Sequence, residues 1–275
     1  MPIGAVFGLT GSGIKDLRQA YLKLIKVVLC EDAALYDFAQ QVEATRWVAS
    51  THQLIAAAEQ IALRLSHGYP VLVHCRNGWD HTCQLTSLVM LMVDAFYRTV
   101  GGFLTLIENE WVACGHRFAL RTGVGERWDV DPTPLVAERY PTARRVLFGR
   151  MSDVGDKAAS PVFLQFLDAV HQIVAQHPTR FEFSDALLVF LADSAFNGRF
   201  GTFFESHETR DLILFTRSLS AHVMDHFGAF VNPDYKEDVS LMRPDLDASQ
   251  IGLWDAFFLR QHPLARPEPA HQPHD

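Results

Sequence analysis

The sequence predicts an α/β fold, in which helices cover a mostly parallel sheet. Residues 70–74 form a short, valine-rich apolar run, which is typical of a strand buried on both faces. Much of the remaining chain has apolar residues at helical spacing, and one such pattern begins directly after Thr82, so that strand, loop and helix follow one another. With 275 residues, 48% of them hydrophobic, the chain is long enough for one large domain.

The helical elements are predicted by apolar residues that recur three and four positions apart. Thr82 can cap the helix that follows the strand-like run. The expected helices are residues 14–28, a stretch within 38–66, residues 82–94, 103–118, 161–173 and 183–196, and two weaker patterns at 212–230 and 251–261.

Two stretches lack this periodicity. Residues 122–159 are rich in Pro, Gly, Asp and Arg, which indicates a long surface excursion. The proline-rich tail from Pro263 is expected to be disordered. We therefore expect one domain over residues 1–262 and a disordered tail over residues 263–275.

Composition excludes some classes of function. A formal net charge of -8 argues against a nucleic-acid-binding protein that works through general basic attraction. The four cysteines are irregularly spaced, and no N-terminal segment combines basic residues with a long apolar core, so a reducing, cytoplasmic setting is expected. Apolar stretches end well before the roughly 18 positions of a membrane span, so any membrane contact is expected to be peripheral.

The segment around Cys75 has the layout of a phosphate-binding loop. Backbone N–H groups of such a loop and the positive end of the next helix can surround a tetrahedral anion and lower the pKa of the thiol. A cysteine there can attack phosphorus and form a phosphocysteine, provided that a cation holds the phosphate oxygens and an acid protonates the leaving alcohol. Asp80 is placed in sequence to be that acid.

Several short motifs resemble those of one family, the myotubularins, which are phosphoinositide 3-phosphatases. The active-site likeness lies in His74-Cys75, Gly78-Trp79-Asp80 and Thr82. The other matching stretches follow in the same order as in the family: Glu43-Ala44-Thr45-Arg46-Trp47, Gln84-Leu85-Thr86-Ser87-Leu88, Tyr97-Arg98-Thr99, Glu110-Trp111, Gly115-His116-Arg117-Phe118, Ser160 to Phe166, Phe181-Glu182-Phe183, Phe200-Gly201-Thr202-Phe203, Asn232-Pro233 and Leu253-Trp254. Collinear agreement over most of the chain makes chance a poor explanation.

The resemblance implies a cysteine-dependent fold similar to that of the protein tyrosine phosphatases, with no cofactor and no metal. The implied ligand is the headgroup of phosphatidylinositol 3-phosphate or the 3,5-bisphosphate, reached from the cytoplasm by peripheral contact with endosomal membranes. It also implies assembly with myotubularin chains of the same or another kind. Because the family carries a lipid-binding domain and several strands ahead of the matched region, the fold is expected to be incomplete on its N-terminal side, with much of residues 122–159 as an insertion.

The resemblance also assigns roles to single residues. Cys75 takes the position of the nucleophile and Asp80 that of the proposed general acid. Phosphate or headgroup contacts are expected from Arg76, Asn77, Gly78, Trp79, Arg117 and Arg121. Three loop positions depart from the family: Arg76 replaces a serine, Asn77 an aspartate, and His81 the arginine that would hold the phosphate.

His81 is the departure with the largest expected effect. Arginine supplies a permanent planar fork, whereas imidazole has at most two divergent donors and is largely neutral at pH 7. Loss of such a cation in phosphoryl transfer lowers the rate by roughly 10³ to 10⁵, so impaired catalysis is expected. Arg76 could restore positive charge, but the sequence does not place its side chain.

Other interpretations stay open from the sequence alone. The chain could be a pseudophosphatase that binds headgroups or an active myotubularin without turnover, or it could fail to fold independently. Asp80 could serve only as a helix cap, and Arg117 and Arg121 could form a solvated basic edge. The last alternative is a zinc site. Its potential ligands are His74, Cys75, His81 and Cys83, but their spacing matches no familiar metal-binding pattern.

Overall fold

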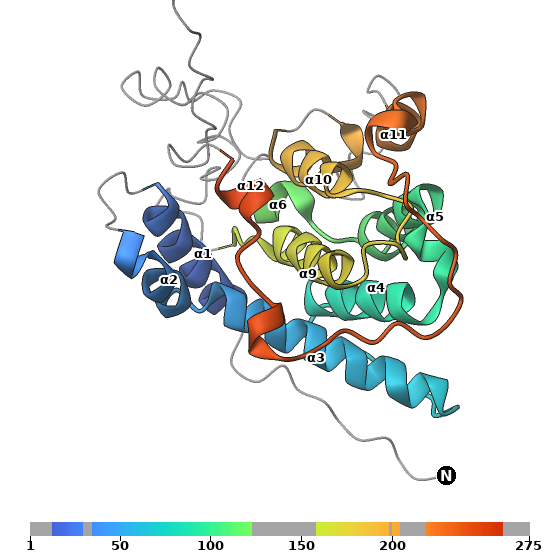
Figure 1. Cartoon of the computed structure of the whole chain (residues 1–275), viewed down its shortest axis with the longest axis horizontal. Helices are drawn as coiled ribbons and strands as arrows, with labels where there is room; N and C mark the ends of the chain where they lie inside the picture. The colour runs from blue at the N-terminus through green and yellow to red at the C-terminus, as the bar shows by residue number, and fades with distance from the viewer. Residues whose placement is uncertain (1–12, 30–34, 123–157, 198–199, 204–217, 261–275) are drawn as a thin grey trace, which may run out of the picture.

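The structure is a computed structural model that describes residues 13–29, 35–122, 158–197, 200–203 and 218–260, and this part of the chain folds into packed helices (Figure 1). The α-helices are α1 (Ile14–Val28), α2 (Leu35–Ala44), α3 (Trp47–Ser66), α4 (His81–Val93), α5 (Val100–Leu106), α6 (Phe118–Thr122), α9 (Val162–Gln176), α10 (Asp185–Asn197), α11 (Leu219–Asp225) and α12 (Asp255–Phe258). A π-helix, η2 (Ile107–Ala113), continues α5, and short 3₁₀ turns are η1 (Ala95–Arg98), η4 (Gly201–Phe203), η6 (Phe227–Ala229) and η7 (Ala248–Gln250).

The predicted α/β class is wrong for this part of the chain. The described residues contain no strand and no sheet, and their β-type pairing is a single isolated bridge between Phe183 and Val231. Residues 71–75 belong to no helix or strand and alternate between partly buried and exposed positions, with Leu72 86% exposed. A strand needs a neighbour for its backbone hydrogen bonds, and no described segment pairs with this one, so its valine-rich sequence does not become part of a sheet.

Helix α9 forms the centre of the molecule. It contacts α3, α4 and α10, and it lies among these helices in Figure 1. Most of its residues are buried, polar Gln165, Asp168 and Gln172 included. A helix that is buried on nearly all sides belongs to the interior of a domain, and its polar side chains then need hydrogen-bond partners within the protein.

The stretch within residues 38–66 forms two helices, because the chain turns between them. Arg46 has a φ of 69°, a left-handed conformation that interrupts a right-handed helix. The Thr45 hydroxyl accepts a hydrogen bond from the backbone N–H of Trp47 at 3.2 Å. The indole of Trp47 then donates to Asp168 on α9 at 2.6 Å, and burial raises the pKa of that carboxyl to about 6. This pair fixes α3 against the central helix.

The predicted helix over residues 103–118 is also divided. Residues 100–113 are helical, with π-helical spacing from Ile107, and the chain turns at Gly115, whose φ is 82°. Glycine adopts this conformation without a steric penalty. The short helix α6 begins only at Phe118, so Arg117 lies just before it. The turn brings α6 close to the beginning of α4, which matters for the site below.

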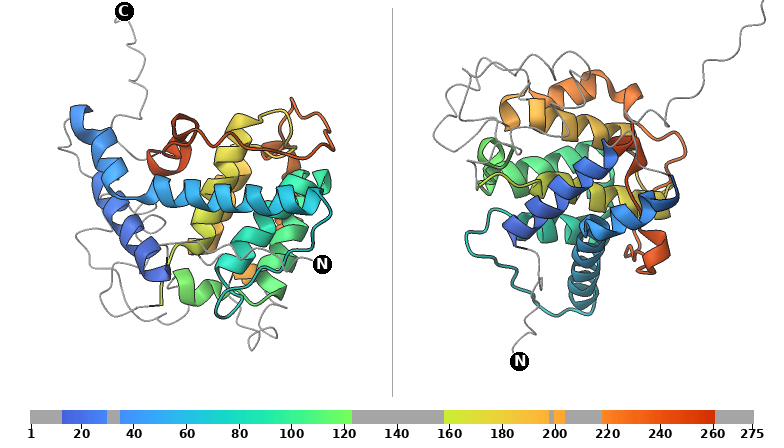
Figure 2. Two further views of the ribbon diagram at one scale, coloured as in Figure 1. Left: turned by 90° about the horizontal axis from the view of Figure 1, so that it is seen from below. Right: turned by 90° about the vertical axis from the view of Figure 1, so that its left-hand side faces the viewer.

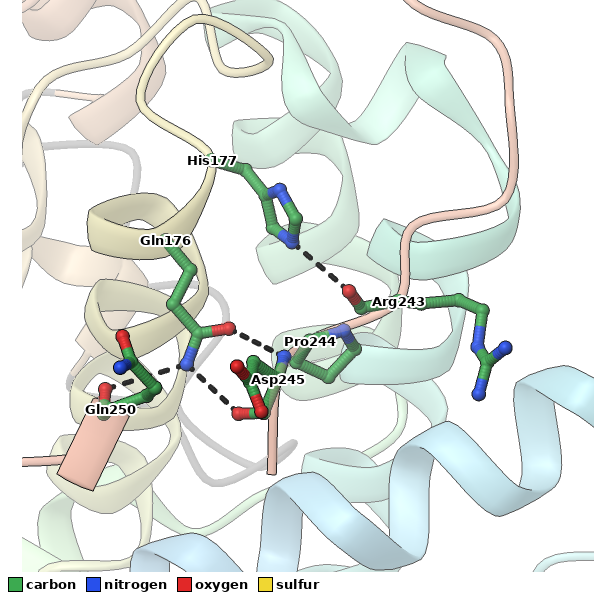
Figure 3. Close-up of a pocket in the computed structure, with 6 residues that line it drawn as sticks. All are labelled: Gln176, His177, Arg243, Pro244, Asp245 and Gln250. Carbon is green, nitrogen blue, oxygen red and sulfur yellow. Dashed lines mark hydrogen bonds between the residues drawn. The ribbon is translucent and has the colours of Figure 1, made fainter. Parts of the chain in front are cut away.

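The C-terminal segment after α11 runs as an extended strap along the outside of the helices (Figure 1). Arg98, which is fully buried, donates to the backbone carbonyls of Leu91, Asp238 and Ser240 and so ties this strap to the end of α4. Farther along, Gln176 of α9 accepts from the N–H of Asp245 and donates to its carbonyl and to that of Gln250 (Figure 3).

These contacts surround a shallow polar pocket between α9 and the strap. His177 hydrogen-bonds the carbonyl of Arg243 at 3.1 Å, as Figure 3 shows, and the guanidinium of Arg243 pairs with Glu59 of α3. The polar groups that line the pocket thus bind one another. The pocket therefore holds the C-terminal strap against α9.

The remaining expectations fall partly outside the described residues. Helices at residues 14–28, 82–94, 161–173 and 183–196 are confirmed within a few positions by α1, α4, α9 and α10. In the weaker patterns at 212–230 and 251–261, only the short α11, η6 and α12 are described. Most of residues 122–159 and the whole tail 263–275 lie outside the described part. Among the described helices, none combines the length and the apolar character that a bilayer crossing requires.

Candidate active site at the Cys75 loop

The chain between α3 and α4 runs along the outside of the helical body and returns through the Cys75 loop to the first turn of α4 (Figure 2). The loop turns at Gly78, which has a φ of 76°. A Cβ atom there would meet nothing within 4 Å, so the constraint on this position is the backbone conformation alone. Asp80 and His81 follow at the beginning of the helix, so that the predicted site residues of the loop gather at one helix N-terminus.

Donors around its sulfur favour the thiolate form of Cys75. Partial burial by itself would raise the pKa of the thiol, but hydrogen bonds from Thr82 and from the backbone N–H groups of Asp80 and Asn77 outweigh it and lower the pKa below its usual value. Thr82 lowers the pKa of the thiol through both its N–H and its hydroxyl; by distance and angle this buried hydroxyl has no hydrogen-bond partner among the described residues, so it is available to the sulfur. The loop is therefore built to stabilise negative charge.

Two buried side chains support the loop from beneath. The thiol of Cys83 donates to the carbonyls of Gly78 and Trp79 at 3.4 and 3.3 Å, and burial raises its pKa, so it remains a neutral donor. The Nδ1 of His116 contacts the same Trp79 carbonyl at 2.6 Å. Burial lowers the pKa of His116 to about 4, so its imidazole is neutral at pH 7 and Nδ1–H is the donor. Both side chains thus engage backbone carbonyls of the loop, so these acceptors have partners within the protein.

Asp80 is held in a buried ion pair. Its two carboxylate oxygens accept hydrogen bonds from Nε and Nη2 of Arg121, each at 2.9 Å, and both side chains are less than a tenth exposed. Arg121 also donates to the carbonyl of Ala158. Asp80 occupies the N-cap position of α4, yet its side chain makes no capping hydrogen bond. Its carboxylate is therefore directed to Arg121 of α6, and the helix cap weighed from the sequence is not formed.

The other predicted headgroup residues lie at the surface of the loop. The guanidinium of Arg117 stacks over the ring of Trp79, 4.1 Å from its centroid. Arg76 and Asn77 are exposed, and Trp79 is half-buried. Arg117 and Arg121 were expected to face one ligand together. In this structure only Arg117 presents its cation at the surface, because Arg121 is engaged with Asp80.

His81 takes the position where a phosphate-binding arginine was expected, and its ring is directed along α4. Its Nδ1 lies 3.0 Å from Oε1 of Gln84, one helical turn later. Gln84 is fully buried, and its Nε2 donates to the carbonyl of Val162 and to Oε1 of Gln165, both on or beside α9 and both at 2.9 Å. His81 is thus connected to the central helix through a buried amide.

No cluster of three or more His, Cys, Asp and Glu side chains with the arrangement of a metal site occurs in the described ranges. The groups that do converge can bind an oxyanion and supply a thiolate nucleophile. Such a loop suits the phosphocysteine chemistry expected from the sequence.

Comparison with known proteins identifies the family. The sequence model for the myotubularin-like phosphatase domain matches residues 7–211. Myotubularin from Xenopus laevis is 33% identical over 260 residues, which cover 91% of this chain, and rat myotubularin is 34% identical over 83% of it. The chain belongs to the myotubularin-like phosphatase family. Bovine phosphatidylinositol-3,5-bisphosphate 3-phosphatase MTMR2 is a further relative, 35% identical over 84% of this chain.

This myotubularin-like chain spans 34% to 39% of the length of these relatives. The match to the family model and to these relatives confirms the family resemblance that was stated from the sequence motifs. The roles of single residues remain predictions. Sequence reasoning weighed Cys83 only as a zinc ligand and gave Gln84 and His116 no role beyond their place in the matching motifs, whereas the structure places all three around the loop. Gln84 carried a signal, since its spacing places it on the same helix face as apolar Leu88 and Leu91.

Proposed function

We propose that this chain is a phosphoinositide 3-phosphatase domain that binds the 3-phosphate of an inositol headgroup at the Cys75 loop and turns it over slowly. The observation that carries this proposal is the set of donors around the sulfur, from Thr82, Asp80 and Asn77, which lowers the pKa of Cys75. The bovine relative MTMR2 is named as a 3-phosphatase of phosphatidylinositol 3,5-bisphosphate, which supports the same class of substrate for this chain.

In the proposed reaction the Cys75 thiolate attacks phosphorus, the bond from phosphorus to the inositol oxygen breaks, and Asp80 protonates that oxygen. Water then hydrolyses the phosphocysteine and releases phosphate. Two features support slow turnover. His81 supplies no permanent cation for the phosphate oxygens, and the Asp80 carboxylate must leave Arg121 before it can carry a proton to the leaving group.

A second candidate function is headgroup binding without turnover. The buried Asp80–Arg121 pair favours it, because a carboxylate held by two charge-assisted hydrogen bonds is a poor proton donor. Peripheral contact with endosomal membranes and assembly with another myotubularin belong to either candidate and remain proposals.

Phosphate release from water-soluble short-chain phosphatidylinositol 3-phosphate tests the proposal. We expect slow release by the wild-type chain, none by Cys75→Ser, and a gain of roughly 10³-fold or more in His81→Arg. Binding of the headgroup by the wild type and by His81→Arg, with no release by either, would support the second candidate. Equal release by the wild type and Cys75→Ser, with no headgroup binding, would rule out both.

A further inference from the structure

The hydrogen bonds of Gln84 determine which nitrogen of His81 carries a proton. The carbonyl of Val162 can only accept, so the Gln84 atom that faces it at 2.9 Å must be the amide nitrogen. The other amide atom, which faces Nδ1 of His81 at 3.0 Å, is therefore the oxygen. Because an amide oxygen only accepts, Nδ1 of His81 must carry hydrogen.

A longer chain of hydrogen bonds fixes this direction. Nε2 of Gln84 also donates to Oε1 of Gln165, and Nε2 of Gln165 donates to the hydroxyl of Ser50 on α3. That hydroxyl in turn donates to the carbonyl of Trp47. Gln84 is fully buried and Gln165 is 3% exposed, so water cannot replace these partners if an amide is reversed. Reversal of Gln84 would place its oxygen against the Val162 carbonyl.

We propose that Gln84 is a positioning residue that holds neutral His81 as the Nδ1–H tautomer, so that Nε2 keeps a lone pair until the ring is protonated. A lone pair repels phosphate oxygens, whereas the imidazolium ion has an Nε2–H donor and a positive charge. Only the imidazolium form of His81 would then supply the cation that the loop lacks. This inference rests on the proposed anion site at Cys75 and adds to it a dependence of anion binding on the protonation of His81.

The neighbouring charged groups do not produce the same pH dependence. Arg76, Arg117 and Arg121 keep their charge throughout, and Asp80 is paired with Arg121. Burial lowers the pKa of His116 to about 4, so this ring stays neutral above pH 5.5. Two further titratable groups lie in this loop, the Cys75 thiol and the exposed imidazole of His74, and both need a control. Cys75→Ser removes the first, and His74→Gln controls for the second.

The tautomer is measured by long-range ¹H–¹⁵N NMR of the chain labelled with ¹⁵N-histidine, with the His81 signals assigned by their loss in His81→Gln. At pH 8 we expect a protonated Nδ1 and an unprotonated Nε2. In Gln84→Met, which lacks the acceptor, the protonated nitrogen is expected to change at least in part to Nε2. An Nε2–H signal in the wild type would overturn the proposal even if Gln84→Met does not fold.

Sulfate is the probe for anion binding, because it keeps both charges between pH 5.5 and 8. In the Cys75→Ser chain we expect sulfate to bind about tenfold more tightly at pH 5.5 than at pH 8. The difference should persist when His74→Gln is added and should vanish when His81→Gln is added, since glutamine offers a donor that does not titrate. Binding that is independent of pH, or a difference that survives His81→Gln, would refute the role of His81. No sulfate binding at either pH would instead refute the anion site itself.

Discussion

The guanidinium of Arg121 binds both carboxylate oxygens of Asp80 at 2.9 Å, and this buried pair joins the beginning of α4 to α6. The two residues were predicted to serve the substrate from separate positions, one as an acid and one as a headgroup contact. In the structure they are each other's partner, which links the geometry of the loop to the stability of the fold.

Arg121→Met is therefore expected to lower the free energy of unfolding by about 3 to 5 kcal/mol, because it leaves the Asp80 carboxylate buried without a counter-charge. Chemical denaturation measures the effect. Arg117→Met is the matched control, since Arg117 is exposed and loses only its stacking on Trp79, at about 1 kcal/mol or less. Adding Asp80→Asn to Arg121→Met should recover part of the loss, and equal effects of the two arginine variants would contradict this account.

Cys75 is expected to react with iodoacetamide faster than Cys114 at pH 7, although Cys114 is the more exposed of the two. The donors around Cys75 lower the pKa of its thiol, whereas partial burial and nearby Glu110 raise that of Cys114. Mass spectrometry of the alkylated peptides gives both rates.

Thr82→Val removes one donor to the sulfur and is expected to slow alkylation of Cys75 at pH 6 by about tenfold. Thr86→Val serves as the control, because its hydroxyl donates to the carbonyls of Thr82 and Cys83 and does not touch the thiol. If both variants leave the rate unchanged, the hydroxyl of Thr82 has no part in activating Cys75.

His116 should make the chain less stable in acid. Burial lowers its pKa in the folded state to about 4, whereas the unfolded chain takes up the proton near the ordinary value of 6.5. The unfolded state therefore binds more protons between these values, and the free energy of unfolding falls as the pH is lowered from 6.5 to 4, by about 3 kcal/mol from this residue.

His116→Asn tests that slope while keeping an N–H donor for the Trp79 carbonyl. Other groups, such as Asp168, titrate equally in both proteins and cancel in the difference between their free energies of unfolding. That difference is expected to change with pH only below about pH 6.5. Parallel stability curves between pH 4 and 7 would show that His116 takes up its proton equally easily in the folded chain.

Gly78 is expected to be sensitive to substitution because of its backbone conformation, with a φ of 76°, and not because of space. Gly78→Ala should cost about 1 to 2 kcal/mol in unfolding free energy and slow the alkylation of Cys75, since alanine disfavours the left-handed region. Gly78→Asn should cost less, because asparagine tolerates it better. The explanation fails if the alanine variant is as stable as the wild type.

The sequence allowed the family, the loop and most helices to be predicted, but not the way in which the polar side chains pair. Helical spacing located α1, α4, α9 and α10 because these helices bury apolar faces, and apolar faces leave a periodic pattern. The turn at Arg46 left no such pattern, because neither glycine nor proline marks it. The error over residues 70–74 has a similar cause: a valine-rich run indicates a strand, but its partner must be supplied by other parts of the structure.

The contacts of the site could not be predicted from spacing. Arg121 lies 41 residues from Asp80, and Gln84 lies 81 residues from Gln165, so their pairing depends on how α4 packs against α6 and α9. We assigned Arg121 to the ligand from its charge and from motif similarity, because the sequence does not show that Arg121 pairs with buried Asp80.

Ser50 lies on α3, in another element than the loop residues, and faces α9, yet its hydroxyl belongs to the series of hydrogen bonds that connects His81 to the Trp47 carbonyl. A substitution there would leave the loop residues themselves untouched and still loosen the orientation of the histidine. Natural variants at the α3–α9 contact should therefore be tested for loss of function as well as for loss of stability. A survey restricted to residues near the Cys75 sulfur would miss such variants.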